Sequence, residues 1–302
     1  MRILSLIASS TEIVYALNQG KHLVGRSHEC DYPEEIKQLP YCTSPRIDIN
    51  GSSREIDRRV KSALKSALSV YEVDEKKLKN LNPDIIITQS QCEVCAVSLN
   101  DVEKAIGSLV KNKPKIVSLE PNSIDDIWTD IEKVSEAIGV LVEGSDLIKN
   151  MKSRISQLQD LSKSQPTRSV ACIEWIDPLM AAGNWVPELV DLAGGINIFG
   201  EKGKHSPWMT FNDLASENPD FIIIMPCGYD IKKTKKEMHH LTRRKNWKNL
   251  KAVQNQNVYL TDGNQYFNRP GPRIVDSLEI LIEILHNLRY DFGHFGLGWQ
   301  RL

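Results

Sequence analysis

Two stretches of the chain share one pattern, and this repeat constrains the fold more than any other feature of the sequence. "LNPDIIIT" (residues 81–88) and "ENPDFIII" (residues 217–224) each place Asn-Pro-Asp directly before an apolar, β-prone run. Asn-Pro is typical of a turn, and a short apolar run after a turn predicts a buried strand. The repeat therefore predicts two similar lobes in which strands alternate with helices, an α/β protein.

The start of the chain supports this plan. Residues 2–7, "RILSLI", are β-prone and lead into Ser9 and Glu12, which have the spacing of a capping box. The apolar residues that follow have helical spacing, and Gly20 is expected to close that helix. Strand, polar turn and helix in this order open an α/β unit.

The rest of the chain continues the alternation. Further strands are predicted at 23–25, 84–88, 113–121 and 169–174, and further helices at 100–110, 123–134, 143–162 and 187–193. We expect an N-terminal lobe at 1–142 with an insertion around 40–75, a linking helix at 143–165, and a C-terminal lobe at 166–302. A stiff linking helix favours limited hinge motion and one ligand cleft between the lobes.

Charge and hydropathy exclude several classes of protein. The 302 residues carry 38 Lys plus Arg against 39 Asp plus Glu, so no net field favours nucleic acid. No apolar run is long enough for a membrane span. The start "MRILSLIASSTE" does not match a secretory signal, which predicts a cytoplasmic protein. A periplasmic or extracellular location stays open if the start is truncated.

Cysteine and histidine in two strand-end loops suggest a metal site. A zinc site is one hypothesis, built from His28, Cys30, Cys92 and Cys95. The Cys-x-x-Cys spacing fits half of such a site, whereas His-x-Cys fits the other half poorly. The alternatives are a redox pair at Cys92 and Cys95, or cysteines that are simply packed in their loops.

Aromatic residues in the second lobe stand beside polar and turn residues rather than inside apolar runs. Each one alone is expected to pack under its own loop. Several at successive strand ends favour a wall for a large planar ligand, and these are Trp175, Trp185, Trp208, Tyr229, Tyr266 and Phe267.

Four stretches carry a resemblance to a known family: "ILSLIASSTEIVYALNQGKHLVGRSHECDYP", "LNPDIIITQSQCEVCAVS", "IVSLEPNSIDDIW" and "FNRPGPRIVDSLEIL". They resemble the substrate-binding proteins of cobalamin, haem and iron-siderophore ABC transporters, the class III periplasmic binding proteins. The likeness covers Arg2 to about His286 and is greatest to a leaderless group labelled cobalamin-binding proteins. It implies two Rossmann-like lobes, one long helix between them, and a corrinoid-sized ligand held between the lobes.

The resemblance also implies positions for ligand contacts. Tyr32 of the "DYP" element would lie at the cleft, with Ser9 and Ser10 at its border. With the aromatic and polar loop residues, the expected ligand-binding set is Ser9, Ser10, His28, Tyr32, Gln91, Glu174, Trp175, Trp185, Trp208, Tyr229, Phe267 and Arg269.

Three functions follow from these observations. We expect a soluble binding protein, not an enzyme, for a corrinoid or a related tetrapyrrole or metal chelate, with the His28 imidazole offered to the ligand's metal. One alternative is a cytoplasmic enzyme on the same scaffold, using a thiolate and acid–base groups among Glu29, Asp31, Glu93 and Glu174. The other is an iron-siderophore or haem transport component that delivers to an ABC permease.

Overall fold

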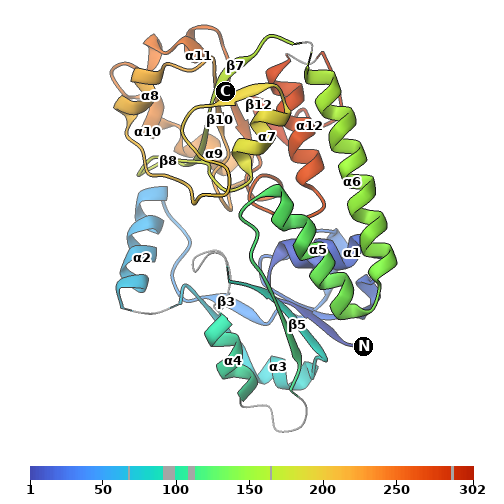
Figure 1. The fold of residues 1–302 in the computed structure, drawn as a ribbon. Coiled ribbons are helices and arrows are strands. Elements are labelled where there is room, and N and C mark those ends of the chain that lie inside the picture. The colour runs from blue at the N-terminus through green and yellow to red at the C-terminus, as the bar shows by residue number, and fades with distance from the viewer. Residues whose placement is uncertain (67–68, 91–98, 108–112, 164, 287–288) are drawn as a thin grey trace. The chain divides into compact units, whose positions relative to one another are not determined.

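The structure is a computed structural model that describes the chain except residues 67–68, 91–98, 108–112, 164 and 287–288 (Figure 1). It divides into two compact units. The first unit comprises residues 1–51, 55–121 and 125–150, and the second comprises 52–54, 122–124 and 151–302. The expected lobe boundaries, with a separate linking helix, stay a prediction.

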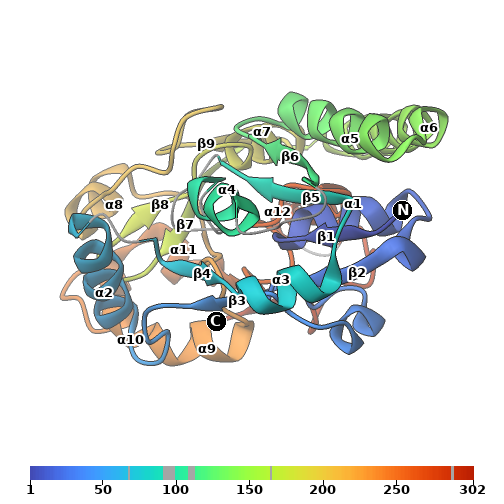
Figure 2. The ribbon, with the colours of Figure 1, turned by 90° about the horizontal axis from the view of Figure 1, so that it is seen from below.

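The first unit contains a parallel four-stranded sheet (Figure 2). Its strand order is β2-β1-β5-β6, with β2 at Leu23–Arg26, β1 at Ile3–Ser5, β5 at Ile85–Gln89 and β6 at Lys115–Leu119. Every residue of β5 is buried, the apolar Ile85–Ile87 and also Thr88 and Gln89, as is typical of a central parallel strand. The helices are α1 (Ala8–Ala16), α3 (Glu75–Leu81), α4 (Leu99–Gly107) and α5 (Ile124–Ile138).

The insertion expected around residues 40–75 forms a small structure of its own. Strands β3 (Thr43–Pro45) and β4 (Tyr71–Val73) pair antiparallel, and helix α2 (Ser53–Lys65) lies between them in the sequence. The helix predicted at 143–162 is α6, which runs from Leu141 to Ser162.

The second unit contains a six-stranded sheet with the order β12-β11-β10-β7-β8, and β9 also pairs with β7. Strands β7, β9, β10 and β11 are parallel, whereas β8 and β12 run antiparallel to their neighbours. The strands are β7 (Arg168–Trp175), β8 (Met180–Ala181), β9 (Gly195–Asn197), β10 (Phe221–Ile224), β11 (Val258–Thr261) and β12 (Trp299–Arg301). The helices are α7 (Val186–Leu192), α8 (Phe211–Glu217), α9 (Ile231–Glu237), α10 (His239–Thr242), α11 (Lys251–Gln254) and α12 (Ile274–Leu285).

The repeated Asn-Pro-Asp has the same local structure in both units, which confirms the predicted repeat. Asn82 ends α3 and Asn218 ends α8, each in the left-handed conformation with φ of 41° and 44°. Asparagine tolerates this conformation better than most residues, and the proline that follows prevents the helix from continuing. The residue after the proline, Asp84 or Asp220, directly precedes the strand.

The predicted boundaries of the first helix are wrong. Helix α1 begins at Ala8, and its N-cap residue is Ile7, so Ser9 lies inside the helix and forms no capping box with Glu12. The helix also ends at Ala16 with Leu17 as its C-cap, before Gly20, and Asn18 takes the left-handed conformation with φ 57°. Short polar side chains bond equally well to the backbone inside a first turn, and the Ser10 hydroxyl donates to the Ile7 carbonyl at 3.0 Å.

The C-terminal tail completes the second sheet. Strand β12 pairs with β11, and its Trp299 is buried with its indole N–H donating to Glu283. No helix in the described parts of the chain is long and apolar enough to cross a bilayer.

Candidate functional site

A cluster of aromatic and polar side chains lies at the carboxyl edge of the second unit's sheet. Trp175 is the last residue of β7, and Tyr229 lies in the loop after β10. Their rings meet edge to face, with centroids 5.3 Å apart and planes at 61°. Carboxyl ends of adjacent parallel strands meet at one edge, where open α/β sheets bind ligands. The predicted neighbourhood of Trp175 and Tyr229 is thus found in the structure.

Three polar atoms in this region are buried without a hydrogen-bond partner among the described residues: Trp175 Nε1, Tyr229 Oη and Asn184 Oδ1. Tyr229 is 2% exposed, and burial, reinforced by the nearby Glu237 carboxylate, raises the pKa of its phenol. The hydroxyl therefore keeps its proton at neutral pH. Buried polar groups normally have hydrogen-bond partners. Two donors and one acceptor without such partners could therefore bind a polar ligand.

The Tyr229 ring also faces a cation. The Lys233 ammonium, on α9, lies 3.9 Å from the ring centroid. Burial lowers the pKa of Lys233, while the carboxylates of Glu237 and Asp230 oppose that shift. One lysine of the basic run 232–236 therefore packs on an aromatic ring of the site.

Glu174, the residue before Trp175 in β7, adds a partly buried carboxyl group. Burial raises its pKa, although a hydrogen bond from the Ser206 hydroxyl at 2.8 Å favours the charged form. The Ser206 hydroxyl in turn accepts the Gly183 backbone N–H at 3.1 Å. A carboxyl group with a raised pKa can donate or accept a hydrogen bond, which suits amide groups on a ligand.

The other aromatic residues of the predicted wall differ in exposure. Trp185 is 6% exposed and Phe267 is 1% exposed, and the Trp185 indole N–H donates to the Phe267 carbonyl at 2.9 Å. Both side chains are buried, and this hydrogen bond joins two loops that are far apart in the sequence. Trp208, by contrast, is 53% exposed, and Arg269 is 5% exposed. Ligand contact by Trp185, Trp208, Phe267 and Arg269 stays a prediction.

In the first unit, His28 follows β2 and lies against the small sheet. Its Nδ1 is 2.7 Å from the Thr43 hydroxyl, and its ring centroid is 5.2 Å from that of Tyr71. Burial, with a smaller effect of the Arg26 guanidinium, lowers its pKa to about 4. The imidazole is neutral at pH 7, the form in which histidine binds metals.

The neighbouring predicted residues are placed differently. Tyr32 is 45% exposed, which fits a contact surface. Cys30 is 1% exposed, and its sulfur accepts the Thr11 hydroxyl at 3.0 Å. Ser9 and Ser10 are also fully buried in the first turn of α1. The Cys30 thiol is therefore a packed core group and not a polar edge of the loop.

The zinc hypothesis receives no support. Gln91, Cys92, Glu93 and Cys95 lie outside the described residues. Within the described ranges, no group of three or more His, Cys, Asp and Glu side chains could hold a metal ion.

Several residues of the second-unit cluster were not found from the sequence. Ser206 is 32 positions from Glu174, and Asn184 gave no signal beyond its place in a Gly-Asn turn. Such contacts depend on tertiary structure, and the only sequence sign of Ser206 is its position in a polar loop beside Trp208.

Comparison with known proteins gives sequence relatives over nearly the whole chain. The pattern of the family described as periplasmic binding protein matches residues 3–265. An ABC transporter substrate-binding lipoprotein of Bacillus subtilis, itself uncharacterised, is 23% identical over 292 residues, covering 94% of this chain and 80% of the relative. A vitamin B12-binding protein of Vibrio cholerae is 23% identical over 284 residues, covering 92% and 86%.

Solved structures share the fold. The periplasmic vitamin B12 binding protein of Vibrio cholerae superposes with a TM-score of 0.68 at 21% identity, covering 95% of this chain and 97% of that one. A periplasmic haem-binding protein of Roseiflexus gives a TM-score of 0.69 at 21% identity, covering 95% and 98%. The predicted two-lobed α/β fold is thereby confirmed.

Proposed function

The chain belongs to the periplasmic binding protein family, and we propose that it binds a cobalamin-like corrinoid or a related metal chelate. Relatives named for vitamin B12 and neighbours named for haem support this class of ligand. The expectation that the ligand lies between the two lobes stays a prediction.

One observation carries the choice of a corrinoid: the carboxyl edge of the second sheet joins an aromatic surface to unpartnered polar atoms. Trp175 is partly exposed and offers ring surface, with the buried Tyr229 ring packed against it, and the Trp175 indole N–H and the Tyr229 O–H have no partner among the described residues. A corrin ring is a broad, largely apolar disc with amide side chains at its rim. The rings suit the disc, while the two donors and the Glu174 carboxyl suit amide oxygens and N–H groups.

His28 supplies a candidate group for the ligand's metal. Its pKa of about 4 keeps a nitrogen lone pair free of protons at neutral pH. Because the Thr43 hydroxyl contacts Nδ1, Nε2 is the candidate coordinating atom. Cobalt and iron both accept imidazole nitrogen.

The test is a titration of the full chain followed by visible absorption. Hydroxocobalamin, hemin and a ferric hydroxamate are each added to the protein, and we expect saturable binding of hydroxocobalamin at one per chain. Trp175→Phe removes the indole N–H and should weaken binding about tenfold, equivalent to about 1.4 kcal/mol. Trp247→Phe, a buried residue of the 3₁₀ turn 247–249, is the control.

His28→Ala separates coordination from general affinity. A cobalt band that shifts with the wild type and not with His28→Ala supports coordination. Saturable binding of hemin or the hydroxamate, with no binding of hydroxocobalamin, would refute the corrinoid and leave the family assignment intact.

A second candidate function is delivery of the ligand to an ABC permease. The Bacillus subtilis relative, named as a substrate-binding lipoprotein of such a transporter, favours it. The expected cytoplasmic location finds no support in relatives named as a lipoprotein and as periplasmic proteins. Fractionation of cells that produce the natural full-length protein tests this candidate: recovery with the membrane or the exported proteins supports delivery, and recovery only in the cytoplasm opposes it.

The enzyme alternative rests on Glu174, whose raised pKa would suit a general acid. Conversion of bound hydroxocobalamin to a chemically altered corrinoid, detected by mass spectrometry and lost in Glu174→Gln, would favour it over simple binding.

A further inference from the structure

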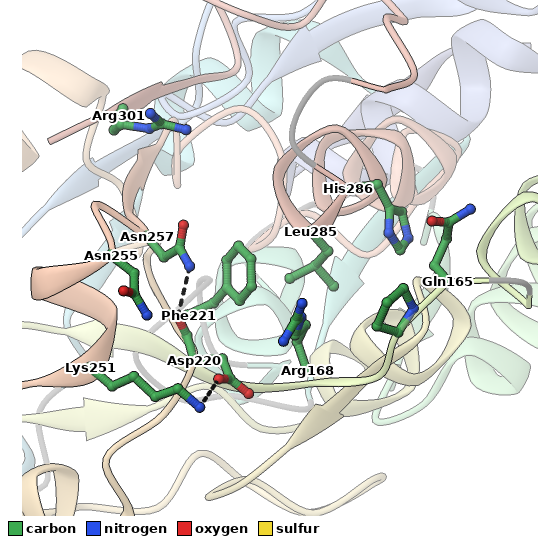
Figure 3. A pocket seen from close by; sticks show the side chains of 11 residues that line it. Gln165, Arg168, Asp220, Phe221, Lys251, Asn255, Asn257, Leu285, His286 and Arg301 are labelled. Carbon is green, nitrogen blue, oxygen red and sulfur yellow. Dashed lines mark hydrogen bonds and ion pairs between the residues drawn. The ribbon is translucent and has the colours of Figure 1, made fainter.

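A cavity of about 600 Å³ lies in the second unit at the edge where the parallel strands begin (Figure 3). Arg168 is the first residue of β7, Phe221 is the first of β10, and Asn257 directly precedes β11. All three line the cavity. Strand β7 ends at Trp175, seven residues on, so the cavity is about 23 Å along the strand from the ring cluster. It is separate from the proposed corrinoid site.

The described lining of the cavity carries an excess of positive charge. Arg168, Lys251 and Arg301 are cations, and Asp220 is the one carboxylate among the described lining residues. Three cations against one carboxylate leave two positive charges.

Asp220 is already engaged by the protein. It forms an ion pair with the Lys251 ammonium and accepts the Ser169 backbone N–H at 2.9 Å and its hydroxyl at 3.0 Å. Burial raises the pKa of Asp220, but these bonds lower it by more, so the pKa lies below its usual value. The carboxylate is therefore ionised and neutralises Lys251, which leaves the two arginines for a ligand.

Arg168 is available for an anion. Among the described residues, its side chain has no hydrogen bond or ion pair, and it is exposed. Figure 3 shows its guanidinium group between Asp220 and the His286 side of the cavity. A guanidinium presents two parallel N–H groups, a geometry that matches two oxygens of one phosphate.

Arg301 is held in place beside the same cavity. Its Nη2 donates to the Tyr259 hydroxyl at 3.1 Å, and its guanidinium carbon lies 5.5 Å from the Tyr259 ring centroid. These contacts use one of five donors, so the others can serve a ligand.

His286 also lines the cavity, where it provides a hydrogen-bond acceptor and not a positive charge. Its Nε2 lies 3.0 Å from the Ala193 carbonyl, which only accepts, so the proton is on Nε2. Burial, with the Arg289 guanidinium, lowers its pKa, and the ring is neutral at pH 7. The Nδ1 lone pair is then an acceptor for a ligand hydroxyl.

We propose that this cavity binds a small phosphate monoester. A phosphate monoester carries close to two negative charges at neutral pH, which balances the two arginines. The volume lies within the range of small-molecule sites and exceeds what a phosphate group alone fills. Phe221, Leu285 and Pro166 supply apolar surface for the organic part.

The test is isothermal titration calorimetry of the full chain at fixed ionic strength. Phenyl phosphate is the probe for the ester, and inorganic phosphate is the probe for the charged group alone. Phenyl phosphate is expected to bind one per chain with a dissociation constant below about 1 mM. It should bind more tightly than inorganic phosphate. Arg168→Ala should weaken phenyl phosphate binding at least tenfold.

The control is Lys248→Ala, which removes an exposed cation that does not line the cavity. It should leave phenyl phosphate binding unchanged, and circular dichroism checks that both variants fold. Absence of phenyl phosphate binding, or an equal effect of Arg168→Ala and Lys248→Ala, would overturn the proposal. Equal affinity for both phosphates would contradict the ester. Arg168→Ala leaves the carboxyl edge of the sheet intact, so hydroxocobalamin binding should not change. The phosphate proposal and the corrinoid proposal can therefore fail independently of each other.

Discussion

The two Asn-Pro-Asp segments have the same backbone role and different surroundings. Asp84 accepts the Arg2 backbone N–H at 2.7 Å, just before β1, and Asp220 accepts the Ser169 N–H in β7. In both units the aspartate thus joins the start of its own strand to the strand beside it. The Asp84 side chain is 52% exposed, however, whereas that of Asp220 is 16% exposed and also holds Lys251. The backbone contact is the same in both copies, and in the second copy the aspartate also lines a cavity.

The largest expected difference between the units comes from removing these aspartates. Asp220→Ala leaves Lys251 and the Ser169 N–H without their partner in a partly buried place, and should lower the free energy of unfolding by about 2–3 kcal/mol. Asp84→Ala removes an exposed contact and should cost about 1 kcal/mol or less. Urea unfolding of both variants measures the difference. Equal losses of unfolding free energy would contradict the different roles of Asp84 and Asp220.

Both units also hold a histidine whose pKa burial lowers: His28 in the first and His286 in the second. Folding prefers the neutral form of each, so their contribution is complete above the unfolded pKa of about 6.5. For His28 it should be lost as the pH falls from 6.5 towards 4, by about 1–2 kcal/mol after allowance for its partial exposure. Urea unfolding between pH 7 and 4 checks this, with His28→Gln expected to flatten that part of the profile. An unchanged slope in His28→Gln would contradict the assignment.

The left-handed asparagines allow a matched test of the repeat. Asn82→Ala should cost about 1 kcal/mol, because alanine is strained at positive φ. Asn82→Gly should cost much less, since glycine adopts this conformation freely. At position 218 the side chain also matters, because its Oδ1 accepts the Lys251 backbone N–H at 2.8 Å, so Asn218→Ala should cost about 2 kcal/mol and Asn218→Gly about 1 kcal/mol. Thermal unfolding compares the four variants. A loss with glycine as large as with alanine would show that the side chain, not the backbone conformation, matters.

The smallest effect is expected at the Tyr229 hydroxyl. Tyr229→Phe removes an oxygen with no partner among the described residues and should change the free energy of unfolding by less than about 0.5 kcal/mol. Tyr290→Phe is the control, because its hydroxyl donates to the Leu161 carbonyl at 3.0 Å and its loss should cost about 1 kcal/mol. Chemical denaturation of both variants decides this, and a larger loss for Tyr229→Phe would reveal a structural role for that hydroxyl.

The sequence predicts the fold well where a local pattern has one physical solution. The apolar run at 85–87, directly after a turn signal, predicts the buried strand β5, and each Asn-Pro follows the end of a helix. The start of α1 could not be predicted as well, because Ser9 and Ser10 are equally compatible with a cap and with a first helical turn. The contact of Ser206 with Glu174 and the cavity beside Arg168 depend on chain segments far apart in sequence.

Calorimetric titration of the full chain with hydroxocobalamin tests whether the carboxyl edge of the second sheet binds a corrinoid. We expect one site per chain, with affinity at least tenfold lower in Trp175→Ala and unchanged in Arg168→Ala. No heat of binding with the wild type, or equal affinity in Trp175→Ala and the wild type, would contradict it.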